Sequence, residues 1–218
     1  MNNVDYIGLT GKIITRENRD YNESIKAWNR AINKKPLVIV YCYNEEDVIN
    51  AIKWARKNSK EFRVRSGAHS YEGYSTGDDV VVIDVSNINY INLNEEKGYV
   101  KIGGGVRNRE AYEALGEKSY PFPGGGCPTV GVPGLILGGG WGYSSRYLGL
   151  ASDSLIEAEI INYKGEKITV NKDKNKDLYW AIMGSGGCNF GVITSMTLSL
   201  KKKEKMGSLI YINFLELY

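Results

Sequence analysis

The sequence predicts an α+β fold, in which helices and strands are mixed without regular β–α–β alternation. Two observations carry this prediction. Hydrophobic side chains make up 42% of the 218 residues, which is enough for a buried core. Short apolar runs typical of strands are interspersed with segments of helical periodicity in an irregular order along the chain.

The N-terminal part predicts two helices and three strands. Residues 1–35 are polar, with one helix expected near 23–32, and the apolar run 37–41 predicts a buried strand. Asn44 is a predicted N-cap with Asp47 three residues on, and the helix that follows extends to about residue 58. A short strand at 62–65, a glycine-containing turn at 66–77 and a strong strand at 80–85 complete this part.

The second part continues with a hairpin and further mixed elements. The predicted elements are the hairpin strands 88–93 and 99–102, a helix at 107–118, a loop rich in glycine and proline at 120–134, strands at 155–161 and 167–170, a helix at 177–183 and a strand at 191–200. After a charged linker, residues 209–214 predict another strand. No later element pairs with it, so we expect it to begin a further domain.

Composition excludes several classes of protein. The formal net charge of +3 gives no reason to expect a nucleic-acid partner. No apolar run is long enough to predict a membrane span, and no secretory signal is visible, so a cytoplasmic location is expected. Three widely spaced cysteines and a single histidine predict neither a disulfide framework nor a metal site, and Cys42 and Cys188 are expected to be ordinary buried residues.

Glycine is unusually abundant. Of 26 glycines, 19 lie between Gly103 and Gly191, in clusters that predict close approach of the backbone to another group. Neither the G-x-G-x-x-G dinucleotide fingerprint nor the G-x-x-x-x-G-K-[ST] phosphate loop is present. Two segments remain as candidates, the turn 65–74, whose successive amides can form an anion-binding nest, and the glycine-rich run 123–142.

Three ordered motifs resemble a known family. Residues 65–73 match R-S-G-G-H-S-Y-E-G, with Ala68 where a second glycine is usual, residues 127–140 match C-P-T-V-G-x-x-G…G-G-G, and residues 180–194 match W-A-x-x-G-x-G-G-x-N-F-G-[IV]-[VI]-T. The sequence thus resembles the FAD-linked oxidases of the vanillyl-alcohol oxidase superfamily, within the berberine-bridge-enzyme-like group. The resemblance implies a PCMH-type FAD-binding domain over 1–205, made of two α/β subdomains at about 1–86 and 87–205. Residues 206–218 would then be the first strand of a missing substrate-binding domain.

The resemblance also implies a bicovalently attached FAD. The matching positions are His69, which would bond the 8α-methyl carbon of the isoalloxazine, and Cys127, which would bond carbon 6. Both nucleophilic side chains stand on glycine-rich turns, where a flat ring can come close to the backbone. The other positions that the resemblance assigns to cofactor binding are Arg65, Ser66, Gly67, Ala68, Ser70, Gly131, Val132, Gly134, Leu135, Gly139, Gly140, Trp141, Gly142, Val192 and Ile193.

Two more positions concern the reaction. Tyr71 matches a position on the substrate side of the ring, although a structural tyrosine is nearly as well favoured. Val130 matches an oxygen-gate position, and a small residue there favours O2 as electron acceptor. The side chains of Trp141 and Trp180 are expected in the core rather than against the ring.

The expected function is therefore oxidation of a hydroxyl- or amine-bearing carbon by hydride transfer to flavin. The substrate would be a small molecule, such as a sugar, an alcohol or an alkaloid-like amine. Because no catalytic base can be named, the chain alone is expected to be a poor catalyst, and its uncovered face is expected to favour self-association. Two alternatives remain: a non-catalytic flavin-binding module, and a small-ligand or carbohydrate-binding domain whose glycines only shape turns.

Overall fold

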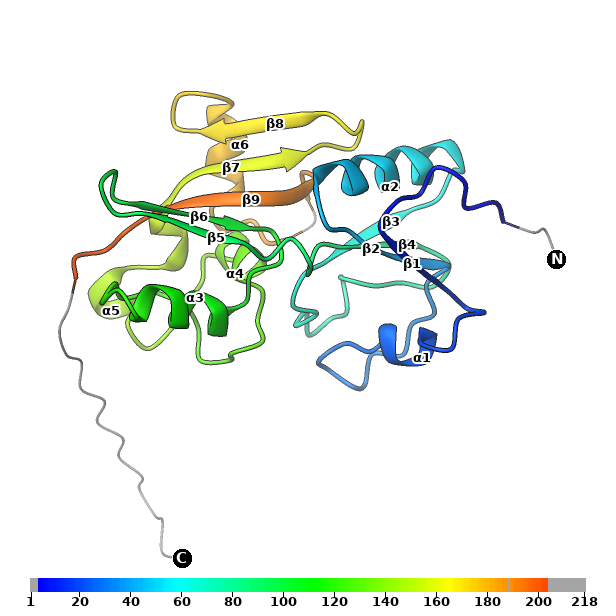
Figure 1. The fold of residues 1–218 in the computed structure, drawn as a ribbon, viewed down its shortest axis with the longest axis horizontal. Helices are drawn as coiled ribbons and strands as arrows, with labels where there is room; N and C mark the ends of the chain where they lie inside the picture. Colours follow the sequence, from blue (N-terminus) through cyan, green and yellow to red (C-terminus); the bar gives the residue numbers. More distant parts are fainter. Residues whose placement is uncertain (1–3, 188, 204–218) are drawn as a thin grey trace, which may run out of the picture.

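The computed structural model describes residues 4–187 and 189–203, which form two sheets that lie side by side along the long axis of the molecule (Figure 1). The first sheet has the strand order β1-β2-β4-β3 and the second has the order β5-β6-β9-β7-β8. The strands are β1 (Lys12–Thr15), β2 (Val38–Tyr41), β3 (Phe62–Arg65), β4 (Val81–Asp84), β5 (Ile91–Asn94), β6 (Tyr99–Gly103), β7 (Leu155–Ile161), β8 (Lys167–Asn171) and β9 (Val192–Ser199). The helices are α1 (Tyr21–Ser24), α2 (Glu45–Lys57), α3 (Asn108–Gly116), α4 (Val132–Leu137), α5 (Ser145–Leu148) and α6 (Lys176–Ile182), with a 3-10 turn η1 (Ala151–Ser154).

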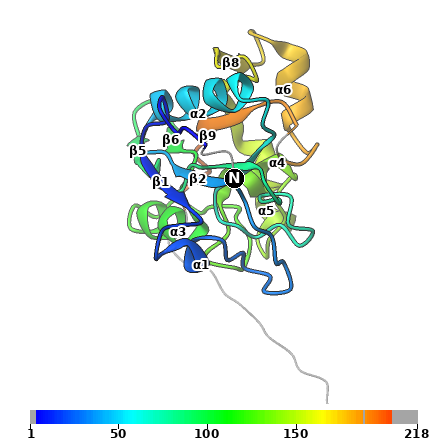
Figure 2. The ribbon, with the colours of Figure 1, turned by 90° about the vertical axis from the view of Figure 1, so that its right-hand side faces the viewer.

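The first sheet is buried on both faces. Strands β2, β4 and β3 are parallel, and β1 adds an antiparallel edge. Alternate residues point to opposite faces of a strand, so Val40 and Ile83 pack with the apolar side of α2, whereas Ile39 and Val82 pack with Tyr21 of α1. The two helices accordingly cover opposite faces of this sheet (Figure 2).

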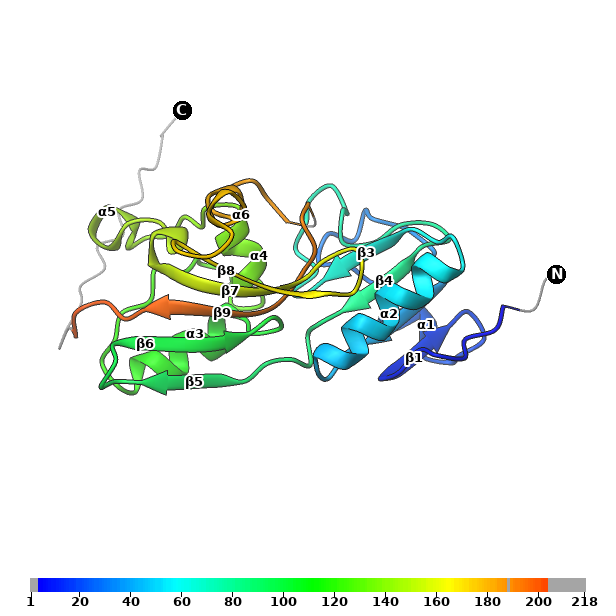
Figure 3. The same cartoon turned by 90° about the horizontal axis from the view of Figure 1, so that it is seen from above.

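The second sheet is antiparallel throughout. Strand β9 pairs with β6 on one side and with the long strand β7 on the other. Residues of β6, β7 and β9, among them Ile102, Ala158 and Met196, form one buried cluster with Val132 and Ile136 of α4. Figure 3 shows α4 and α6 on the same side of this sheet. The expected mixture of helices and strands is thus confirmed, and the strands form two sheets.

A polar cluster joins the two sheets. Lys167 of β8 lies 2.9 Å from Glu45 of α2 and 3.2 Å from Glu159 of β7. The Thr194 hydroxyl of β9 donates to the other Glu45 oxygen at 3.1 Å. Because α2 packs on the first sheet and the other three residues belong to the second, this cluster connects the two sheets.

Several local predictions are confirmed. Asn44 caps α2 as expected, since its side-chain oxygen accepts from the Asp47 amide at 3.0 Å. Cys42 is fully buried at the end of β2, and burial raises the pKa of its thiol. The hairpin, the helices at α3 and α6 and the strands β7 to β9 lie where the sequence patterns predicted them.

Other local predictions are wrong. The expected helix at 23–32 is only the single turn α1, because the chain after Ser24 turns toward the 66–77 loop, and the Trp28 amide donates to the Ala68 carbonyl at 3.0 Å. Strand β1 was not predicted, since it is a four-residue edge strand with little apolar pattern. Helix α4 begins inside the expected loop, with Pro133 in its first turn, where a missing N–H costs nothing.

Some expectations fall outside the described residues. The predicted strand at 209–214 and the expected buried state of Cys188 belong to this group. Within the described ranges, no helix is both long and apolar enough to cross a membrane.

Candidate functional site: a cleft between two glycine-containing loops

Two loops that are far apart in sequence pack against each other between the sheets. The first follows β3 and carries His69, and the second precedes α4 and carries Cys127. At their contact, a Cβ added to Gly67 would lie 2.3 Å from the Gly131 amide nitrogen, and one added to Gly131 would lie 2.4 Å from the Ser66 hydroxyl oxygen. Only glycine at both positions allows this approach.

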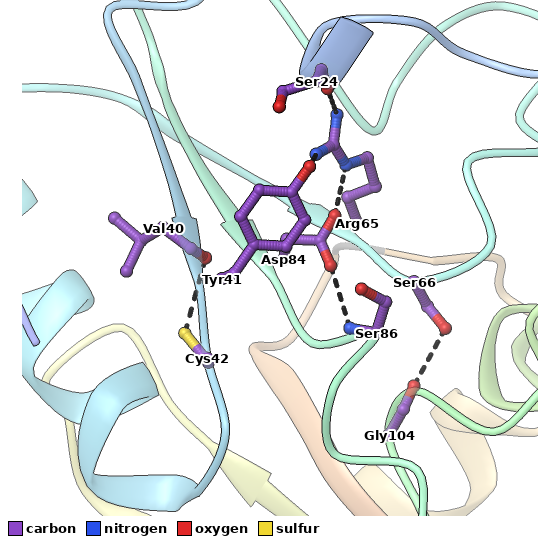
Figure 4. A network of polar contacts seen from close by, with 9 residues as sticks. All are labelled: Ser24, Val40, Tyr41, Cys42, Arg65, Ser66, Asp84, Ser86 and Gly104. Atoms are coloured by element: carbon purple, nitrogen blue, oxygen red, sulfur yellow. Dashed lines mark hydrogen bonds and ion pairs between the residues drawn. The ribbon is translucent and has the colours of Figure 1, made fainter. Parts of the chain in front are cut away.

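A buried ion pair anchors the His69 loop at its start. Arg65, the last residue of β3, pairs through Nε with Asp84 at the matching register position of β4. Its other nitrogens donate to the Ser24 carbonyl at 2.7 Å and to the Tyr41 hydroxyl at 3.3 Å (Figure 4). Both charged side chains are at least 95% buried, so the pair is compensated by hydrogen bonds rather than by water.

Helix α3 holds the Cys127 loop. The buried Asn108 side chain donates to the Cys127 carbonyl at 3.0 Å, and its backbone amide donates to the Val130 carbonyl at 2.9 Å. The next amide, that of Arg109, donates to the Pro128 carbonyl at 3.0 Å. The Cys127 residue itself is exposed, in contrast to the buried Cys42.

His69 makes a side-chain contact between the two loops. Its Nε2 lies 2.7 Å from the Thr129 hydroxyl oxygen, although the two residues are 60 positions apart. Its ring stacks on Trp28, with 5.0 Å between the ring centroids and 23° between the planes. Burial and, to a smaller extent, the charge of Arg107 lower the pKa of His69 below its usual value, which favours the neutral imidazole.

The His69 loop presents unpaired backbone donors. Among the described residues, the amides of Gly67, Ala68, His69 and Ser70 have no hydrogen-bond acceptor. Ala68 has φ of +57°, in the left-handed region where a Cβ is costly, at the position where the motif usually has glycine. Successive amides around a left-handed residue are the geometry that binds anions such as phosphate.

These loops line one cleft of about 380 Å³. Its walls come from both sheets and contain no charged side chain within the part of the chain that the structure describes. The lining residues predicted from the sequence are Ser66, Gly67, Ala68, His69, Ser70, Tyr71, Cys127, Val130, Gly131, Gly134, Leu135 and Ile193. The structure therefore brings His69 and Cys127 into the same cleft.

Other residues assigned from the resemblance do not line this cleft. The Arg65 side chain is buried in its ion pair with Asp84. The side chains of Val132 and Val192 are fully buried, each in a different hydrophobic cluster. Gly139, Gly140, Trp141 and Gly142 lie beyond α4. There a Cβ on Gly142 would lie 1.9 Å from the Gly124 carbonyl oxygen, so glycine at this position allows two loop segments to pack together.

The expectation that two tryptophan side chains are core residues is wrong. Trp141 is 71% exposed and Trp180 is 78% exposed. Trp180 lies in the two-turn helix α6, which packs on the core through Ile182 and Tyr179, whereas the Trp180 side chain faces solvent.

Sequence patterns did not identify every residue of the cleft. The residues that line it without having been predicted there are Trp28, Val64, Tyr74, Ser75, Val85, Gly104, Pro133, Leu137, Gly187 and Gly191. The glycine clusters pointed to Gly104 and Gly187, but no local signal marks Trp28, which reaches the cleft through its contacts with the distant Ala68 and His69.

Comparison with known proteins identifies the family to which this chain belongs. The FAD binding domain family matches residues 36–171. YgaK of Bacillus subtilis (strain 168), an uncharacterised FAD-linked oxidoreductase, is 42% identical over 193 residues, which cover 87% of this chain and 43% of YgaK. Two solved structures are similar to this chain, each at a TM-score of 0.85. The first is 6-hydroxy-D-nicotine oxidase of Arthrobacter nicotinovorans, which is 31% identical and is matched over 88% of this chain and 42% of the oxidase. The second is BBE-like 1 of Physcomitrella patens, which is 34% identical and is matched over 87% of this chain and 42% of that protein.

Fold, cleft and matches together define an FAD-binding domain of the PCMH type. Within that class, the chain belongs to the berberine-bridge-enzyme-like family of FAD-linked oxidoreductases. It spans less than half the length of these relatives.

The residues of the cleft fit a flat, phosphate-bearing cofactor. A Cβ added to Gly134 or Gly187 would meet no protein atom within 4 Å, although both residues line the cleft. The space beside these glycines is therefore open to a ligand rather than filled by protein. The unpaired amides at 67–70 supply donors for phosphate, and the wide uncharged walls suit an aromatic ring.

Proposed function

We propose that this chain binds FAD in the cleft and carries it through two covalent bonds, one to His69 and one to Cys127. The observation that carries the proposal is the convergence of an imidazole and an exposed thiol on one cleft that contains no charged side chain among the described residues. The amides of 67–70 would hold the pyrophosphate, and the backbone at Gly131, Gly134 and Ile193 would lie along the cofactor.

The chemistry that FAD supplies when bound is acceptance of a hydride from a carbon that bears a hydroxyl or an amine. We propose a sugar, an alcohol or an alkaloid-like amine as substrate and O2 as the final acceptor. Val130 lines the cleft with a small side chain, which leaves room for O2, and Tyr71 stands at the mouth with 73% of its surface exposed.

The chain by itself should load flavin better than it turns over substrate. A catalytic base must reach the proton that it removes, and the described lining of the cleft offers no carboxylate for that role. The chain also covers 43% of YgaK, so more than half of that relative has no counterpart in this chain. We therefore propose a flavin-carrying oxidoreductase domain whose substrate-binding part lies in sequence that this chain does not contain.

Denaturation tests the attachment. The purified chain, incubated with FAD and precipitated with acid, should keep flavin absorbance in the pellet. Substituting either His69→Ala or Cys127→Ala should leave one bond intact, and the double variant should release all flavin. Cys42→Ala is the matched control, because Cys42 is buried away from the cleft and its loss should not change the retained flavin. Retention in the double variant would contradict both assignments.

Peroxide release tests the reaction. Flavin-loaded chain mixed with sugars, alcohols or cyclic amines should release little H2O2, whereas addition of dithionite should still bleach the bound flavin. Steady H2O2 release with any of these substrates would show that the chain is catalytically complete.

A further inference from the structure

His69 is held by two side chains from outside its own loop. Thr129 contacts Nε2 at 2.7 Å from the Cys127 loop, and Trp28 stacks on the ring face from the segment after α1. Trp28 is in turn tied to the His69 loop, since its amide donates to the Ala68 carbonyl at 3.0 Å. The position and the plane of the imidazole are therefore both set by partners that are remote in sequence.

The two ring nitrogens differ in their surroundings. Nε2 has the Thr129 hydroxyl as partner, whereas Nδ1 has no hydrogen-bond partner among the described residues. A neutral imidazole carries one N–H and one free lone pair. When Nε2–H donates to the Thr129 hydroxyl oxygen, the lone pair lies on Nδ1, which is then the nucleophilic atom.

We propose that Thr129 and Trp28 are positioning residues for the covalent attachment of flavin to His69, an inference that rests on the proposed function. Thr129 holds Nε2, so that in the tautomer whose Nε2–H donates to the hydroxyl the Nδ1 lone pair is free to react, and Trp28 fixes the ring plane against rotation. Thr129 thereby couples the two loops, because the residue that prepares His69 lies two positions after Cys127.

Forming the bond between His69 and the flavin is an oxidation, and O2 is the oxidant. The Nδ1 lone pair forms a bond to the 8α carbon, one methyl C–H bond and the Nε2–H bond break, and the two protons and two electrons pass to O2 as H2O2. Nε2 thus changes from a donor to an acceptor in this step. A hydroxyl can follow the change, since it accepts before the reaction and donates afterwards.

The experiment measures attachment to His69 alone. The full chain carrying Cys127→Ser is prepared without flavin, mixed with FAD in air-saturated buffer and sampled over time for flavin that survives denaturation. Adding Thr129→Val should slow attachment about tenfold at saturating FAD, while Thr129→Ser should stay within about twofold of the parent. Trp28→Leu should slow it about threefold. Reversible FAD affinity, read from flavin fluorescence, should change little in the two Thr129 variants, whose altered side chain is not part of the cleft lining.

The outcomes separate the two proposals. Equal attachment rates in the Thr129→Val variant and the parent, or equal losses in Thr129→Val and Thr129→Ser, would overturn the positioning role while leaving attachment to His69 intact. If the Cys127→Ser parent retains no flavin after denaturation, attachment to His69 fails and the positioning role fails with it.

Discussion

At the scale of single residues, the cleft depends on where side chains are absent. Gly67 and Gly131 are required because the two loops touch there, and a Cβ on either would collide with backbone or with Ser66. Gly134 differs from them, since a Cβ at this position meets no protein atom within 4 Å. Because Gly134 also lines the cleft, a side chain at this position would enter the open space of the cleft rather than the protein's own packing.

Substitution of Gly134 separates binding from folding. The Gly134→Leu chain should fold and gain about 0.5–1 kcal/mol in its free energy of unfolding, because glycine is costly in a helix. The new side chain enters the cleft, so FAD affinity should fall at least about tenfold. Fluorescence titration and urea unfolding measure the two effects.

Gly116 provides the control for that prediction. It is also a helical glycine with no protein atom within 4 Å of an added Cβ, but it lies on α3, outside the cleft. Gly116→Leu should leave FAD affinity unchanged, and a loss equal to that of Gly134→Leu would refute the assignment of the cleft.

At the scale of elements, strand β3 shows that two arginines two positions apart have different roles. Arg65 is buried and pairs with Asp84, whereas Arg63 pairs with the exposed Glu61 at 3.1 Å. A buried ion pair adds little over an apolar pair, but removing one partner leaves the other charge unpaired in a dry environment. Exposed pairs are screened by water and contribute less than about 1 kcal/mol.

Unfolding experiments distinguish these two pairs. Arg65→Ala should lower the free energy of unfolding by about 3–5 kcal/mol, since it leaves the Asp84 carboxylate buried and unpaired. Arg63→Ala on the same strand should lower it by less than about 1 kcal/mol. Urea denaturation of the two variants measures the difference, and equal losses would contradict the structural role of the Arg65 ion pair.

At the scale of the whole molecule, the cleft lies between two sheets, so its shape depends on their relative position. Charged and polar contacts connect the two sheets, and they are made by Glu45, Lys167, Glu159 and Thr194. Hydrogen bonding to Glu45 is the largest of the effects that raise the pKa of Lys167, and Glu159 adds to it. The stabilisation is therefore fully present below the ordinary lysine pKa of 10.5 and is lost as pH rises through the raised value.

This cluster predicts a pH-dependent difference between two variants. Glu45→Gln should be less stable than the parent at pH 8, and this deficit should shrink as the pH rises above 10.5, because the parent's Lys167 then loses its charge. The loss stays small, since Lys167 is 45% exposed and water screens the pair. Glu46→Gln, an exposed neighbour on α2, should match the parent at every pH in thermal unfolding. A deficit for Glu45→Gln that does not change with pH would contradict the ion pair.

Sequence by itself determined the family, the mixed fold and both candidate attachment residues. Local patterns suffice for these, because an N-cap such as Asn44, an apolar strand or a motif around His69 is carried by neighbouring residues. The tertiary structure alone decided that Arg65 faces the interior and that Trp28 and Thr129 contact His69. The physical reason is that these contacts join residues tens of positions apart, so strand register and loop packing, which no local pattern encodes, bring them together.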